Sequence, residues 1–105
     1  MSYEGFKLDG FNKSNPYINS PVTLGDNTFN FEVRWNFEFD FGYVIIRDNN
    51  NKLLLGATAL VNGLKITLDQ RVLPGYLKFL QVNGEKYEPE IGNIEKEFAF
   101  YYVNE

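Results

Sequence analysis

The stretch from Phe29 to Phe41, FNFEVRWNFEFDF, alternates between apolar and polar side chains without interruption. This period of two predicts a β-strand with one buried face. A single strand of this length would span about 40 Å at roughly 3.3 Å per residue, more than twice the length of an ordinary strand of about 5–6 residues. Either the strand is unusually long, or the alternation continues through a bend and directs some aromatic side chains outward.

The aromatic content extends this argument to the whole chain. Among 105 residues there are ten Phe, seven Tyr and one Trp, or 17%. This length predicts one domain with a single hydrophobic core. Aromatic rings suit sheet surfaces and protein interfaces, where they bury a large area at a small entropy cost. We therefore expect an all-β core, and the surplus of rings for so small an interior indicates a contact surface.

The charge pattern excludes some partners. The formal net charge is −4 and the ten Lys and Arg residues are scattered, so nucleic acid is not an expected partner. No apolar run approaches the roughly 20 residues that cross a bilayer, so no membrane association is expected. The first residues, MSYEGFKLDG, lack a basic segment followed by an apolar one. We therefore expect synthesis without Sec export.

Turn signals divide the chain into short strands. Residues 1–21 lack sustained periodicity and are expected to form an irregular N-terminal arm, with residues 22–105 as the β domain. Turns recur about every 8–12 residues, as expected for a small antiparallel β-sandwich or partly open barrel. The expected strands start near Tyr17 or Val22 and continue at 28–36, 42–47, from 52, 64–68, 76–82 and 98–103. The expected turns are 25–27, 48–51, 62–63, 73–75 and 83–84, the last closing a hairpin before an acidic loop over 85–95.

Catalytic chemistry has little support in the sequence. The chain has no His and no Cys, which removes the commonest general base, the commonest metal ligand and thiolate nucleophiles. A group of carboxylates could in principle supply a glycosidase-like pair, but such runs are usually solvated loop faces. These carboxylates are Glu85, Glu88, Glu90, Glu95 and Glu97. We expect no catalytic residues, no metal and no cofactor.

The order of several short motifs resembles that of a known family. An alternating strand ends at Trp35-Asn36, a Gly42-Tyr43 step opens the next strand, and an Asp48 turn closes it. The motifs Leu60-Val61-Asn62-Gly63-Leu64, Leu73-Pro74-Gly75-Tyr76-Leu77, Glu88-Pro89 and Ile91-Gly92 follow, before a final strand over 98–102. From Val22 to Val103 the chain resembles the small baseplate plug proteins of contractile-tailed phages, a family first defined on a cyanophage. The Trp that often follows the first Gly is here Tyr43.

The resemblance implies a non-enzymatic structural protein of the virion tail baseplate that is made in the host bacterial cytoplasm. Its expected partners are the baseplate hub, spike and tail-tube proteins, with several copies in each phage or tailocin particle. It also ends a strand at Trp35-Asn36, so that residues 37–41 become a connection. The interface residues expected on this basis are Phe37, Phe39 and Phe41, together with the arm aromatics Tyr3, Phe6 and Phe11.

Two alternatives remain open at this point. One is a long bent strand whose aromatic face, Phe37 to Phe41 included, lies wholly in the core. The other is a carbohydrate-binding or adhesin-like β-sandwich with a platform of stacking rings. The rings of that platform would be Trp35, Tyr43, Tyr76, Tyr101 and Tyr102.

Overall fold

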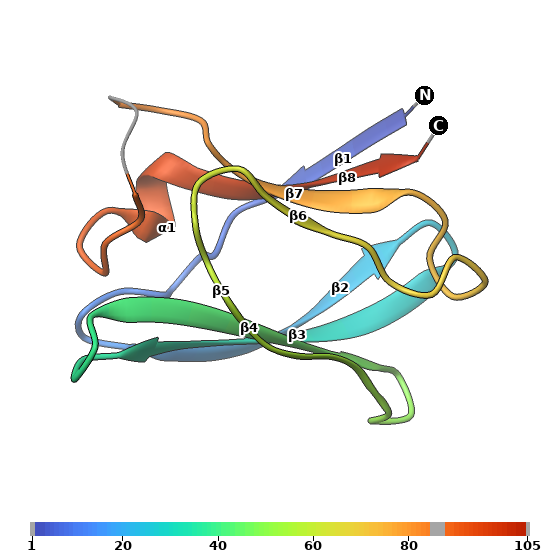
Figure 1. The fold of residues 1–105 in the computed structure, drawn as a ribbon, viewed down its shortest axis with the longest axis horizontal. Helices are drawn as coiled ribbons and strands as arrows, with labels where there is room; N and C mark the ends of the chain where they lie inside the picture. The colour runs from blue at the N-terminus through green and yellow to red at the C-terminus, as the bar shows by residue number, and fades with distance from the viewer. Residues whose placement is uncertain (1, 85–87, 105) are drawn as a thin grey trace.

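Two antiparallel four-stranded sheets pack face to face in the computed structural model, which describes residues 2–84 and 88–104 (Figure 1). One sheet has the order β1-β8-β7-β6, and the other has the order β2-β3-β4-β5. The strands are β1 (Ser2–Phe6), β2 (Tyr17–Leu24), β3 (Asn27–Asn36), β4 (Phe41–Asp48), β5 (Leu53–Ala59), β6 (Leu64–Ile66), β7 (Tyr76–Gln81) and β8 (Phe98–Asn104). The prediction of a small all-β domain is confirmed, in the form of a sandwich.

The second sheet is built from consecutive hairpins. Each of its strands pairs with the next in the chain, so that Phe31 of β3 lies opposite Ser20 of β2 and Ile46 of β4. Gly25 closes the first hairpin with a φ of 60°, a left-handed conformation that glycine adopts without steric cost. The polar residues of β3 alternate with four inward-facing side chains, which are Phe29, Phe31, Val33 and Trp35.

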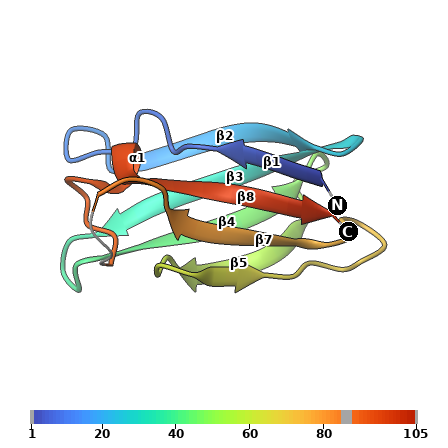
Figure 2. The same ribbon diagram turned by 90° about the horizontal axis from the view of Figure 1, so that it is seen from above.

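The first 21 residues are more regular than the sequence suggested. β1 pairs with β8 from Ser2 opposite Asn104 to Phe6 opposite Phe100, which brings the two ends of the chain side by side (Figures 1 and 2). β2 then runs without a break across the expected boundary between residues 21 and 22. Pro21 fits there because β2 is an edge strand, where a missing N–H need not interrupt a ladder. The pairing of β1 has no local signal, since its partner lies at the other end of the sequence.

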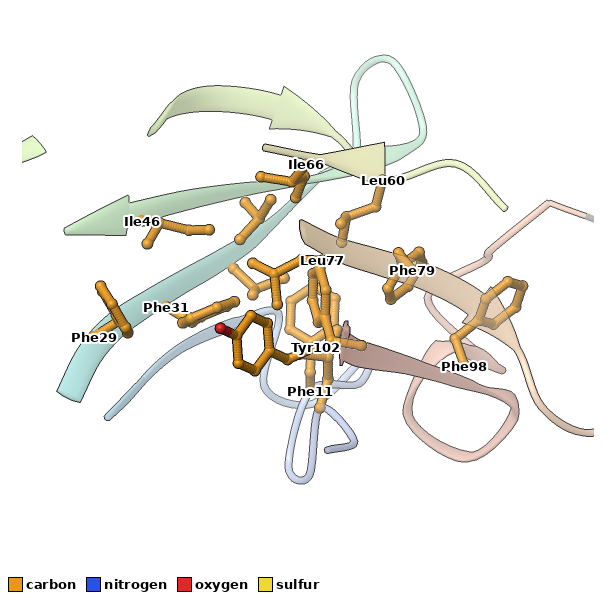
Figure 3. Close-up of a cluster of buried hydrophobic side chains, with 14 of the residues drawn as sticks. Phe11, Phe29, Phe31, Ile46, Leu60, Ile66, Leu77, Phe79, Phe98 and Tyr102 are labelled. Carbon is orange, nitrogen blue, oxygen red and sulfur yellow. The ribbon is translucent and has the colours of Figure 1, made fainter. Parts of the chain in front are cut away.

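Aromatic side chains from both sheets fill the interior (Figure 3). The rings of Phe6 and Phe31 meet edge to face at 5.1 Å, and Phe79 lies 4.8 Å from Phe100 and 5.3 Å from Phe98. Phe11, in the connection between β1 and β2, is fully buried in the same core. Among the described residues no Ser, Thr, Asn, Gln or charged side chain is buried, and the hydroxyl of the buried Tyr102 donates to the carbonyl of Pro74 at 2.5 Å.

The connection from β7 to β8 differs from the expected tight hairpin. Asn83-Gly84 does not join the two strands directly, and the chain instead continues to a single helical turn, α1 (Ile94–Glu97), before β8 begins. The buried side chains of Ile91 and Ile94 attach this connection to the core. Apolar anchoring by two residues outside the strand pattern therefore overrides the local preference of Asn-Gly for a two-residue turn.

Candidate functional site

The turn between β3 and β4 carries the most exposed aromatic side chains of the described residues. Phe37 is 58% exposed and Phe39 is 71% exposed. The side-chain oxygen of Asn36 accepts hydrogen bonds from the main-chain N–H groups of Glu38 (2.9 Å) and Phe39 (3.1 Å). Asp40 then reverses the chain with a φ of 56°. This turn is held by its own hydrogen bonds, so the two rings lie on a fixed backbone.

The end of β3 explains why the alternating apolar side chains are buried up to Trp35 and exposed after it. Up to Trp35 the apolar residues belong to β3 and point between the sheets, but β3 ends at Asn36. The next apolar residues lie in the turn, beyond the reach of the opposite sheet, and only Phe41 returns to a strand. The strand end expected at Trp35-Asn36 is confirmed, and the long bent strand is wrong. The connection expected over residues 37–41 is one residue shorter, because Phe41 already belongs to β4.

A groove of about 600 Å³ lies beside this turn on the outer face of the second sheet. Its centre is a row of side chains from neighbouring strands, because Tyr17 of β2 and Tyr43 of β4 both lie directly opposite Arg34 of β3. The guanidinium carbon of Arg34 lies 4.7 Å from the ring centroid of Tyr17. The groove is lined by Pro16, Tyr17, Arg34, Trp35, Asn36, Phe37 and Tyr43.

The charge of Arg34 is balanced inside the chain. Its guanidinium makes an ion pair of 2.6 Å with Glu32, and the hydrogen bond to Glu32 raises the pKa of Arg34. The row therefore offers aromatic surface and a neutralised cation rather than a net positive charge. The ring of Phe41, 6.1 Å from that of Tyr43, extends this surface to the base of the turn. We call Tyr17, Arg34, Phe37, Phe39, Phe41 and Tyr43 the aromatic end.

Trp35 adds an energetic observation at the same end of the sandwich. Its side chain is 7% exposed, and its indole N–H is buried with no hydrogen-bond partner within the described part of the chain. A buried donor without a partner costs about 1–3 kcal/mol. The stability of the isolated chain is therefore not optimised at this end.

The structure does not bring the six predicted interface residues together. Phe37, Phe39 and Phe41 lie at the aromatic end, but Phe6 is half-buried in the aromatic core and Phe11 is fully buried. Both side chains pack in the core that β1 and the connection after it help to close, and Phe11 is completely enclosed there. Tyr3 belongs to β1 opposite Val103, and its side chain lies outside the described part of the structure.

The rings of the carbohydrate alternative do not form one platform either. Trp35 and Tyr102 are buried. Tyr43 lies on β4 of one sheet, whereas Tyr76 and Tyr101 lie on β7 and β8 of the other. Stacking on a sugar requires exposed rings close to one plane, and this arrangement does not supply them.

Two of the carboxylates considered for catalysis have structural roles. Glu95 accepts hydrogen bonds from the main-chain N–H of Gly10 at 2.6 Å and from the amide of Asn12 at 3.4 Å. Glu88 accepts one from the main-chain N–H of Asn62 at 3.1 Å. Glu85 lies outside the described residues.

Over residues 2–84 and 88–104, no group of three or more metal-ligating side chains is placed to hold an ion. Nor does that part of the chain contain a helix long and apolar enough to cross a membrane.

Tyr17 and Arg34 were not predicted from the sequence as part of this groove. Neither residue stands out in its own segment, because the row depends on the register between three strands. An alignment of the β2–β3 hairpin about its Gly25 turn places Tyr17 opposite Arg34, and this was the available signal.

The fold and the aromatic end define the class: a small all-β protein that presents aromatic side chains on a rigid sandwich. A family model described as cyanophage baseplate Pam3 plug gp18 matches residues 10–105. The chain therefore belongs to this family of phage baseplate plug proteins, which confirms the resemblance found in the sequence, and it is a structural protein of the baseplate. Neither curated proteins nor solved structures gave a match.

Proposed function

We propose that this protein is a non-enzymatic component of a contractile tail and assembles with the baseplate hub, spike and tail-tube proteins through its aromatic end. Several copies act in each particle. The observation that carries the proposal is the exposure of Phe37 and Phe39 on a turn whose backbone is fixed by Asn36. Large apolar side chains that are exposed together on one turn are typical of an interaction site.

The energetic argument compares the free and assembled chain. Burial of an exposed phenylalanine contributes about 1.5–3 kcal/mol, and because the turn is already ordered, little of this is spent on fixing the backbone. Phe37 and Phe39 would insert into a neighbouring subunit, and the flat row of Tyr17, Arg34 and Tyr43 would pack beside them. Aromatic and Arg side chains are enriched among the residues that dominate interface energies. The role of Tyr3 in contacts near the N-terminus stays a prediction.

The test is the double substitution Phe37→Ser with Phe39→Ser. Both side chains are mostly exposed, so the free energy of unfolding should change by no more than about 0.5 kcal/mol. Incorporation into particles, measured by quantitative mass spectrometry of purified tails, should fall at least tenfold because two buried rings are lost from the interface.

The matched control is Leu53→Ser, which removes an exposed apolar side chain (53% exposed) opposite Arg47, at the far end of the β4–β5 ladder from the aromatic end. It should be incorporated like the wild type. Normal incorporation of the phenylalanine variant would refute the proposal, as would an equal loss in the control.

A further inference from the structure

The outer face of the other sheet places two lysines directly opposite each other. Lys65 of β6 pairs with Lys78 of β7, and their neighbours Ile66 and Leu77 are buried, so both lysines point outward. Directly opposite side chains on paired strands are about 4.5–5.5 Å apart at Cβ, and like charges there are destabilising. Within the described part of the chain the ion pairs involve Arg34 and Arg71 but neither lysine.

Tyrosines flank both lysines. The Lys65 ammonium lies 4.4 Å from the ring centroid of Tyr76, and Tyr101 of β8 lies directly opposite Lys78. Tyr101 is also held in place, because its ring lies over Gly5 so closely that a Cβ there would be 2.9 Å from Tyr101 Cε1. We call Lys65, Tyr76, Lys78 and Tyr101 the lysine–tyrosine face.

A mainly apolar groove of about 570 Å³ opens beside Tyr76, Lys78 and Tyr101. It is lined by Tyr76, Lys78, Leu80, Gln81, Val82, Tyr101 and Val103. Val82 is 39% exposed, so apolar surface reaches solvent at the end of the groove. Positive charge therefore stands at the margin of a hydrophobic hollow, on the sheet opposite the one that carries the aromatic end (Figure 1).

We propose that the lysine–tyrosine face binds an acidic polypeptide segment of a neighbouring protein. Carboxylates of that segment pair with Lys65 and Lys78, which also relieves the repulsion between the two ammonium groups, and an apolar side chain enters the groove. Charge complementarity selects this occupant, because the face is positive on a chain whose net charge is −4. Nucleic acid fits less well on so acidic a chain, and a second copy with its own charge of −4 is repelled at long range.

Zero-length carbodiimide cross-linking of intact particles tests the occupant directly. The reagent activates a carboxyl group, a lysine amine in contact displaces it as a urea, and an amide bond remains for detection by mass spectrometry. We expect amide bonds from Lys65 or Lys78 to Asp or Glu of another baseplate protein. Links from these lysines only to a second copy, links to no other chain, or protection by nucleic acid would each overturn the proposal.

The second measurement separates binding from stability. Lys65→Gln with Lys78→Gln removes the repulsion, so the free energy of unfolding should stay equal or rise slightly, while incorporation into particles falls roughly tenfold. The matched control, Lys13→Gln with Lys52→Gln, removes two exposed lysines elsewhere and should leave incorporation unchanged. Unchanged incorporation of the Lys65 and Lys78 variant would refute the role of this face.

The two proposals fail separately. If the lysine variant is not incorporated while the Phe37 and Phe39 variant is incorporated normally, the proposal for the aromatic end is refuted and the proposal for the lysine–tyrosine face is supported. The opposite result would refute only the proposal for the lysine–tyrosine face.

Discussion

The two halves of the stretch from Phe29 to Phe41 share one pattern and have opposite fates. In the first half Phe29 and Phe31 are 1% exposed, whereas in the second half Phe37 and Phe39 are 58% and 71% exposed. The side chains are identical and the spacing is the same. What differs is the backbone, which belongs to a paired strand up to Asn36 and to a turn after it.

This comparison separates periodicity from burial. An alternating pattern shows only that apolar and polar side chains take turns along the chain. The apolar side chains are buried only where an opposite sheet covers them. The opposite sheet covers Phe31, which contacts the rings of Phe6 and Phe100. Nothing in the described chain covers Phe39, and a partner subunit is the proposed cover.

The strongest way to break the comparison is to truncate one ring from each half. Phe31→Ala should lower the free energy of unfolding by about 3–5 kcal/mol, because it leaves a cavity among packed aromatic rings. Phe39→Ala should change it by less than about 0.5 kcal/mol. Urea unfolding followed by tryptophan fluorescence measures both. A loss above 2 kcal/mol for Phe39→Ala would mean that its ring belongs to the core.

Substitutions of Asp40 test whether the conformation of the turn is fixed. Its φ of 56° is left-handed, a region that costs roughly 1–2 kcal/mol for a side chain with a Cβ. Asp40→Val should destabilise the protein by about that amount, since a β-branched residue tolerates this region least, whereas Asp40→Gly should be neutral or slightly stabilising. Thermal unfolding distinguishes them. Equal melting temperatures for the two variants would show that the turn relaxes to another conformation and does not hold the rings in place.

The local parts of the fold were predictable because their determinants are neighbours in sequence. The hairpin turn at Gly25, the strand end at Asn36 and the turn at Asp48 each follow from side chains that bond or shape their own backbone. The exposure of Phe37 and Phe39 was expected because the family resemblance ended a strand at Trp35-Asn36, and the local cause of that strand end is the hydrogen bonding of the Asn36 side chain. The prediction of this half of the candidate site therefore needed no tertiary information.

The parts that were missed depend on contacts between distant segments. β1 is a strand because Gly5 leaves room for the ring of Tyr101, which is remote in sequence. Phe11 is buried because the connection after β1 folds over the interior, and its surrounding Gly and Asn residues suggest only an irregular segment. The row of Tyr17, Arg34 and Tyr43 requires the register of three strands, and the hairpin turn at Gly25 sets only the pairing of Tyr17 with Arg34.

A last comparison concerns two turns that use the same device with different chemistry. The turn at Asn36 is closed by a neutral side-chain amide, whereas the turn after β6 is closed by Asp69, whose carboxylate accepts from the main-chain N–H of Arg71 at 2.9 Å. The guanidinium of Arg71 also donates to Asp69, at 2.7 Å. These bonds, the side-chain bond first, lower the pKa of Asp69 from 3.8 to about 2.

The pH dependence of the Asp69 turn follows from this shift. Because the folded pKa lies below the unfolded value, the stabilisation is fully present above about pH 4 and is lost as the pH falls through 2. Arg71→Ala should return the pKa of Asp69 towards 3.8, as read from its carboxyl ¹³C shift during an acid titration. Arg34→Ala, which removes an equivalent exposed arginine from Glu32, should leave the Asp69 titration unchanged. An Asp69 midpoint that stays near 2 without Arg71 would assign the shift to the main-chain N–H alone. The side-chain amide of Asn36 does not titrate, so the hydrogen bonds that close the Phe37–Phe39 turn should not weaken at low pH.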